Sequence, residues 1–166
     1  MNFVLSRPQG DKPDVYRELA QMAKGLLADE RDPIANAANL SALIFLELPD
    51  LNWVGFYFLQ GSELVLGPFQ GKPACVRIPL GEGVCGTAAQ RRESVLVRDV
   101  NAFPGHIACD VASKSELVVP LMANGTLLGV LDLDSPFTDR FNKEDRMGCE
   151  ALAALWVEFS KGPPFV

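Results

Sequence analysis

The stretch SELVVPLMANGTLLGVLDLDS, residues 115–135, contains the clearest fold signal in the chain. Its two apolar runs flank Asn124-Gly125, a dipeptide that favours the tight turn of a β-hairpin. Upstream, NWVGFYFL and ELVLGPF (52–59 and 63–69) form a second candidate hairpin around a turn at Gln-Gly-Ser. ACVRIPL and SVLV are shorter apolar runs that indicate two further strands. The pattern therefore predicts a mainly antiparallel sheet.

Helical patterns flank this sheet at both ends of the chain. DKPDVYRELAQMAKGLLADE, residues 11–30, begins with Asp and Pro and places its apolar residues on one face. A second helix is expected over residues 32–49 and a C-terminal helix over residues 142–159. GEGVCGTAAQR, residues 81–91, is typical of a glycine loop that enters a short helix. We expect one α+β domain with α/β/α layers over residues 1–166.

Composition excludes several classes of function. The 166 residues carry a net charge of -6, which argues against nucleic acid or an anionic membrane as the main partner. The N-terminus lacks the apolar centre of a secretory signal, and no run approaches the ~18 apolar residues of a membrane span. The sequence thus predicts a cytoplasmic protein, in which thiols are kept reduced and a persistent structural disulfide is not expected.

The four cysteines differ in their surroundings. Cys109 lies in residues 99–115, which show neither helical nor strand period, and loops of this length are often functional. Cys85 falls in the first turn of a predicted helix, where the helix dipole favours a thiolate, so local electrostatics alone make it the preferred nucleophile. Cys75 begins a strand-like run and Cys149 lies on an apolar helix face. Packing remains an alternative for each of them.

The only histidine, His106, lies three residues before Cys109. A Cys-His pair is one way to activate a thiol, although a surface histidine is the more frequent finding in a loop. Zinc is an alternative, because Cys75, Cys85, His106 and Cys109 are suitable ligand types. Their intervals of ten, twenty-one and three residues match no zinc knuckle or ribbon. We therefore expect no metal and no cofactor.

Acidic and aromatic residues are expected to meet on one face of the sheet. Asp132 and Asp134 share a strand face, and the hairpin brings Glu116 to the same end. Crowded carboxyls raise one another's pKa, which keeps a proton available near neutral pH. Trp53 and Tyr57 also share a strand face. The alternatives are a solvent-exposed edge strand for the acids and core packing for the aromatic pair.

Five motifs resemble those of the free methionine-(R)-sulfoxide reductases, which are GAF-domain enzymes: NWVGFY, GPFQGKPACVRIPLGEGVCGTAA, DVNAFPGHIACD, SELVVP and GVLDLDSP. The resemblance covers nearly the whole chain. It implies a GAF-like fold and reduction of free L-methionine-(R)-sulfoxide to methionine, through a cysteine sulfenic acid and an intramolecular disulfide. It also implies thioredoxin as the reductant of that disulfide.

The same resemblance assigns the site. It implies that Cys109 is the catalytic cysteine, against the electrostatic preference for Cys85, and that Cys75 and Cys85 are the candidates to resolve the sulfenic acid. It further implies that the substrate site is lined by Glu116, Asp132, Asp134, Trp53 and Tyr57. The long loop at residues 99–115 is the expected lid over a closed pocket that reads a free amino acid.

Two other functions are compatible with the residues. A GAF-type sensor would bind a small molecule or report redox state without chemistry. A thiol hydrolase would use Cys109 with His106 but lacks an evident orienting partner. Apolar helix faces at both ends of the chain also favour a homodimer.

Overall fold

The computed structural model describes residues 10–107 and 109–161. Within them a six-stranded antiparallel sheet has the strand order β3-β2-β1-β6-β5-β4. The strands are β1 (Trp53–Gln60), β2 (Glu63–Gly71), β3 (Arg77–Pro79), β4 (Val95–Val97), β5 (Ser115–Ala123) and β6 (Thr126–Ser135). The helices are α1 (Lys12–Leu27), α2 (Pro33–Glu47), α3 (Gly83–Arg91) and α4 (Lys143–Phe159), with a 3-10 turn at Val100–Ala102.

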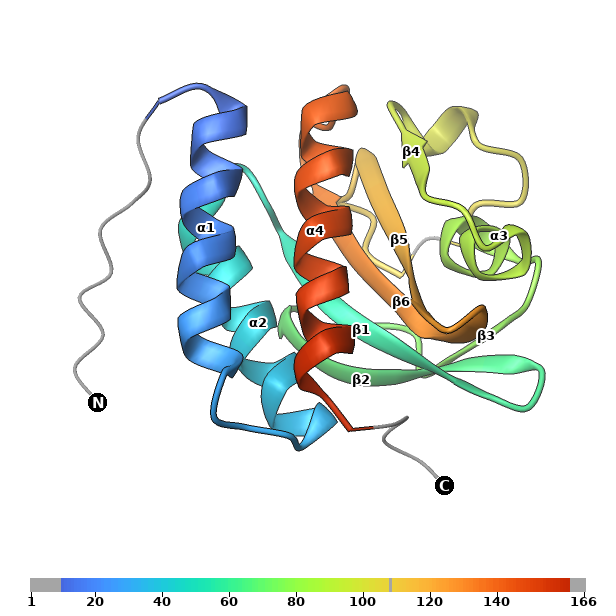
Figure 1. Ribbon diagram of the computed structural model, residues 1–166. Coiled ribbons are helices and arrows are strands. Elements are labelled where there is room, and N and C mark those ends of the chain that lie inside the picture. Colours follow the sequence, from blue (N-terminus) through green and yellow to red (C-terminus); the bar gives the residue numbers. More distant parts are fainter. Residues whose placement is uncertain (1–9, 108, 162–166) are drawn as a thin grey trace.

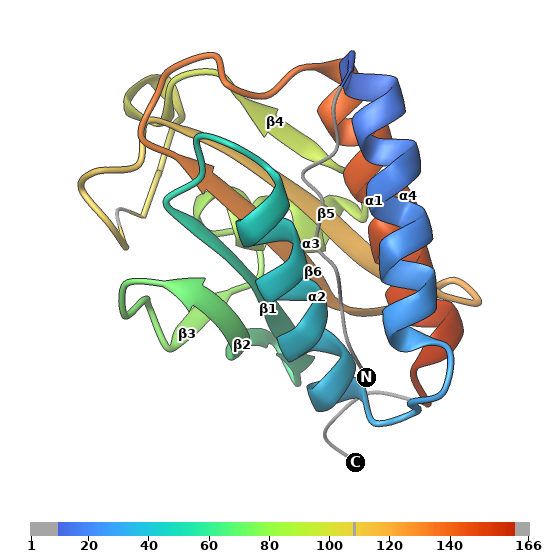
Figure 2. The same cartoon turned by 90° about the vertical axis from the view of Figure 1, so that its left-hand side faces the viewer.

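The helices cover the two faces of the sheet unequally. Figures 1 and 2 show α1, α2 and α4 on one face and the short α3 on the other. The predicted antiparallel sheet and α+β class are confirmed, and both expected hairpins are present. No helix in residues 10–107 and 109–161 has the length and apolar character needed to cross a bilayer.

Strand alternation separates two cores. In β1 the side chains of Val54, Phe56 and Phe58 pack under the three helices, whereas Trp53 and Tyr57 belong to the core on the α3 side. Because successive side chains of a strand point to opposite faces, each strand contributes to both cores. The α3 side carries one short helix, against three on the other face.

Local signals of the sequence act as expected at the ends of the elements. Asp32 caps α2 by accepting hydrogen bonds from two backbone amides, and Asn142 forms a capping box with Asp145 at the start of α4. Asn124 and Gly125 have φ values of 49° and 78°, as a two-residue hairpin turn of this type requires. These contacts fix where helices and strands begin.

The predicted strand at ACVRIPL is shorter than expected. Only Arg77–Pro79 form β3, and Cys75 lies before the strand. The reason is that the preceding segment is held by side chains of β1: Trp53 Nε1 donates to the Lys72 carbonyl at 3.1 Å and Tyr57 Oη donates to the Cys75 carbonyl at 3.0 Å. These two bonds hold the Lys72–Cys75 segment at the mouth of the α3 side.

Gly148 allows α1 and α4 to pack closely, and its replacement tests this packing. A Cβ at Gly148 would lie 2.1 Å from the ring of Tyr16, whose hydroxyl donates to Asp145 Oδ1 at 2.9 Å. We expect Gly148→Ala to lower the free energy of unfolding by about 1–3 kcal/mol, because the anchored ring cannot move aside. Urea denaturation measures the change.

Gly25 provides the matched control for this prediction. It also lies in a helix, but a Cβ added there meets no atom within 4 Å. Gly25→Ala should raise the free energy of unfolding by about 0.5–1 kcal/mol, through helix propensity alone. Equal effects of the two substitutions would contradict the packing argument.

Candidate active site

Three acidic side chains come together on the α3 face of the sheet. Glu116 in β5 pairs with Asp134 in β6, and Val118 pairs with Asp132, so the three acids lie on adjacent rows of the same face. Glu116 and Asp132 are buried, with exposed fractions of 6% and 5%, and Asp134 is partly exposed. Because β6 lies between β1 and β5, the alternative of a solvent-exposed edge strand is wrong.

Burial determines the protonation of these acids. Desolvation raises the pKa of Glu116 well above its usual range, and the charges of Asp132 and Asp134 raise it further. Desolvation likewise raises the pKa of Asp132 to about 7 and the pKa of Asp134 well above its usual value. The charge of Asp132 contributes to the raised pKa of both Glu116 and Asp134. Near neutral pH the cluster therefore retains protons that it can donate.

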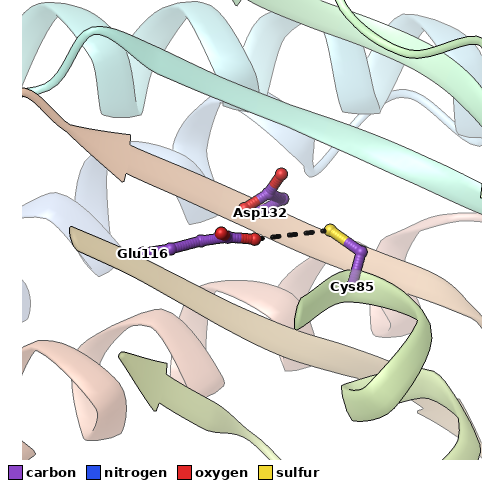
Figure 3. A group of neighbouring side chains, drawn as sticks. All are labelled: Cys85, Glu116 and Asp132. Carbon is purple, nitrogen blue, oxygen red and sulfur yellow. Dashed lines mark hydrogen bonds between the residues drawn. The ribbon is translucent and has the colours of Figure 1, made fainter. Parts of the chain in front are cut away.

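Cys85 faces this cluster from the first turn of α3. Its Sγ donates a hydrogen bond to Glu116 Oε1 at 3.8 Å, and Figure 3 shows the two side chains pointing at each other beside Asp132. Burial raises the pKa of this thiol well above its usual value, and Asp132 and Glu116 raise it further. The expectation of a thiolate at Cys85 is wrong, because burial among acids outweighs the helix dipole.

Cys75 and Cys109 form a disulfide at the mouth of the pocket. Their Cα atoms are 5.5 Å apart, although the residues are separated by 34 positions. With both sulfurs in this bond, the four-residue zinc set considered from the sequence cannot form. Cys149 is fully buried between α1 and α4, as its apolar helix face predicted. Cys85 and Cys149 are the free thiols.

His106 belongs to the pocket rather than to the surface. Its side chain is only 15% exposed and its Nε2 lies 3.7 Å from Glu116 Oε2. Burial lowers the pKa of His106, which favours the neutral imidazole. The surface position expected for this histidine is wrong, because the loop folds inward over Glu116. The sequence around His106 contains no pattern that predicts its contact with Glu116.

The two aromatic residues line the same pocket. Trp53 and Tyr57 stack with ring centroids 5.8 Å apart. The residue between them that faces the same way is Gly55, where a Cβ would lie 2.5 Å from the Trp53 ring. Because Gly55 has no side chain, the Trp53 indole can lie over this position of the strand. Sheet, α3 and loop together place these two rings beside Ile78, Cys85, Cys109, Glu116, Asp132 and Asp134.

Polar contacts hold the loop that carries Cys109 over the pocket. Asn52 Nδ2 donates to Asp110 Oδ2 at 3.3 Å and to Ser113 Oγ at 3.0 Å, while Lys72 Nζ lies 3.4 Å from the same Asp110 oxygen. The cavity beneath has a volume of about 30 Å³. Reasoning from the sequence missed Asn52 and Ser113, because their importance depends on the position of a loop that no local pattern defines.

The site combines a thiol pair that can cycle between dithiol and disulfide with neighbouring carboxyls that hold protons. A reaction in which sulfur is the nucleophile and an oxygen must be protonated needs both features. The fold and this thiol-lined acidic pocket define the protein as an α+β protein with a redox-active thiol site. Comparisons with known proteins identify the class more closely.

The GAF domain family matches residues 15–156. The free methionine-R-sulfoxide reductase of Escherichia coli is 50% identical over 144 residues, which cover 87% of each chain. The structure of free methionine-R-sulfoxide reductase from Neisseria meningitidis in complex with its substrate has a TM-score of 0.90 and 43% identity, covering 93% of each chain. A GAF protein from Burkholderia vietnamiensis is 62% identical at a TM-score of 0.89, covering 91% of this chain and 96% of its own. This chain belongs to the GAF-domain family of free methionine-R-sulfoxide reductases.

Proposed function

We propose that this protein reduces free methionine-(R)-sulfoxide to methionine with Cys109 as the nucleophile. The observation that carries the proposal is the Cys75–Cys109 disulfide at the mouth of a pocket that contains Glu116, Asp132 and Asp134. The names of the relatives from Escherichia coli and Neisseria meningitidis support this choice of substrate.

The proposed chemistry has two steps. In the first, the Cys109 thiolate attacks the sulfoxide sulfur while a protonated carboxyl donates to the sulfoxide oxygen, which is transferred to Cys109. The products are methionine and a Cys109 sulfenic acid, so sulfur of the substrate is reduced and sulfur of the enzyme oxidised. In the second step the thiol of Cys75 condenses with the sulfenic acid, releasing water and forming the disulfide.

Cys75 is the better of the two candidates for this second step. It already lies within bonding distance of Cys109, whereas Cys85 is buried under α3 with its sulfur turned toward Glu116. Burial also disfavours the thiolate of Cys85, and the thiolate is the reactive form. Cys85 therefore acts by donating a hydrogen bond to Glu116 and holding that carboxyl in place.

The acids and the aromatic rings bind different parts of the substrate. Glu116 and Asp134, which face each other across β5 and β6, serve the sulfoxide oxygen. Asp132, the acid with the pKa of about 7, pairs with the substrate ammonium, whose charge favours ionisation of this carboxyl. Trp53 and Tyr57 pack against the methyl group and side chain. A closed pocket that pairs an acid with the ammonium selects a free amino acid over a peptide.

Turnover requires that the disulfide be reopened, and the pair lies at the mouth of the pocket, where another thiol protein can reach it. We assign this role to thioredoxin, and the cytoplasm as the compartment in which that reductant is maintained. The opening of the bond also frees the Cys109 loop, which lies over the pocket that the amino acid enters. We also propose that two copies of the chain form a homodimer, which covers apolar helix faces.

Substrate selectivity tests this function. The purified protein is incubated with dithiothreitol and free methionine-(R)-sulfoxide, its (S) epimer or a peptide-bound sulfoxide, and methionine formation is measured. We expect turnover with the free (R) form and at least about a hundredfold less with the other two, because each loses a buried polar contact. Binding of methionine sulfoxide without turnover would instead support a non-enzymatic GAF-type sensor.

A further inference from the structure

The sulfur of Cys85 and the carboxyl groups of Glu116 and Asp132 lie side by side in the pocket, as Figure 3 shows. One ligand atom from each residue lies within 4.8 Å of the other two. Around a zinc ion bound at ~2.0–2.3 Å, ligand atoms are about 3.5 Å apart, so small side-chain rotations close this set. All three residues lie on rigid elements, the first turn of α3 and the strands β5 and β6.

A second observation indicates a cation at this point. Asp132 is only 5% exposed, and its buried Oδ1 has no hydrogen-bond partner among the described residues. A buried acceptor without a partner is unfavourable, and a bound cation would satisfy it. The cavity beside it has a volume of about 30 Å³, which is room for an ion and a water molecule.

We propose that Cys85, Glu116 and Asp132 form a binding site for one Zn²⁺ ion, with water in the fourth position. One thiolate and two carboxylates suit Zn²⁺, whereas Mg²⁺ and Ca²⁺ prefer sites made of oxygen alone. The ion binds by displacing the proton of the Cys85 thiol and the protons held by the two carboxyls. No electron is transferred, and the ion does not require the catalytic thiols.

The surroundings support this ligand set. His106 Nε2 lies 3.7 Å from Glu116 Oε2, the oxygen that does not bond Cys85, so the imidazole covers the other side of this carboxyl. Cys75 and Cys109 are bonded to each other and contribute no ligand, so the site exists while the disulfide is formed. The zinc set considered from the sequence shared only Cys85 with the ligands proposed here.

Metal binding of this kind would compete with the proposed substrate. Both use Asp132 and Glu116, so the ion and the amino acid exclude each other. This consequence rests on the proposed function, but the binding of the ion does not. The protein would bind the metal even if it had no reductase activity. Metal binding is therefore measured directly, without an activity assay.

Cobalt spectroscopy on the disulfide form tests the site directly. Co²⁺ replaces Zn²⁺ as the probe, because a thiolate bound to cobalt gives a charge-transfer absorption band in the near ultraviolet. Cys85 and Cys149 are the remaining free thiols, so Cys149→Ala serves as the matched control. We expect one Co²⁺ per chain, the same band in Cys149→Ala, no band in Cys85→Ser, and displacement of the cobalt by Zn²⁺.

A carboxylate variant covers the case in which Cys85→Ser fails to fold. Asp132→Asn keeps the size of the side chain and should weaken Co²⁺ binding at least tenfold, with the circular dichroism spectrum unchanged. Absence of cobalt binding to the wild-type protein, or an unchanged band in Cys85→Ser, would overturn the proposed site.

Discussion

Replacing Cys109 by serine is expected to lower kcat/KM for free methionine-(R)-sulfoxide at least about a thousandfold. A serine hydroxyl is a far weaker nucleophile than a thiolate. Glu116 and Asp134 do not act as bases for it near neutral pH, because burial raises the pKa of both carboxyls. The rate of methionine formation with dithiothreitol measures the loss.

The other cysteine variants give distinct results. Cys75→Ser should form about one methionine per chain in a single turnover and accumulate a Cys109 sulfenic acid, because the condensing thiol is lost. Its multiple-turnover rate with thioredoxin should fall sharply.

The matched control is Cys149→Ala. Cys149 is buried between α1 and α4 and is remote from the disulfide, so this variant should retain the wild-type rate. Full activity of Cys109→Ser would remove the proposed nucleophile from the mechanism.

The sequence predicted those parts of the fold that depend on local pattern. Asn124-Gly125, the capping residues Asp32 and Asn142, and the alternation in NWVGFYFL each correspond to a turn, a helix start or a strand with two faces. Strand period and hairpin pairing also sufficed to bring Glu116, Asp132 and Asp134 together, since register follows from the position of the turn.

The environment of each side chain was less accessible to sequence reasoning. Cys85 was expected to be ionised, because its helix position was visible in the sequence and its burial against Glu116 was not. His106 was expected at the surface for the same reason. Both depend on how α3 and the irregular loop pack onto the sheet, and neither segment carries a periodic signal. The identity of the disulfide partner likewise depends on this long-range packing.

Replacing Glu116 by glutamine is expected to lower kcat by about 10²–10⁴-fold while changing KM much less. The carboxyl proton is needed in the transition state, where charge develops on the sulfoxide oxygen, and an amide N–H is a much weaker acid. Because glutamine matches glutamate in size, the packing around Cys85 should persist. Steady-state kinetics on the folded variant measures the two constants.

The matched control for this substitution is Glu93→Gln, which removes a carboxylate from the exposed turn after α3. Glu93 does not line the catalytic pocket, so kcat should remain within about twofold of the wild-type value. A similar loss in both variants would show that overall charge, rather than the acid in the pocket, governs the rate.

The pH dependence distinguishes an acid from a residue that only positions the substrate. The pKa of Glu116 is raised by burial and by its two acidic neighbours, so the proton-donating form dominates below this raised pKa and is lost as pH increases through it. The Cys109 thiolate has the opposite requirement, because it forms as pH increases. The wild-type kcat should therefore pass through a maximum, and its alkaline decrease should disappear in Glu116→Gln, since the amide does not titrate. If the decrease persisted unchanged in this variant, Glu116 would be a positioning residue and Asp134 the better candidate for the proton donor.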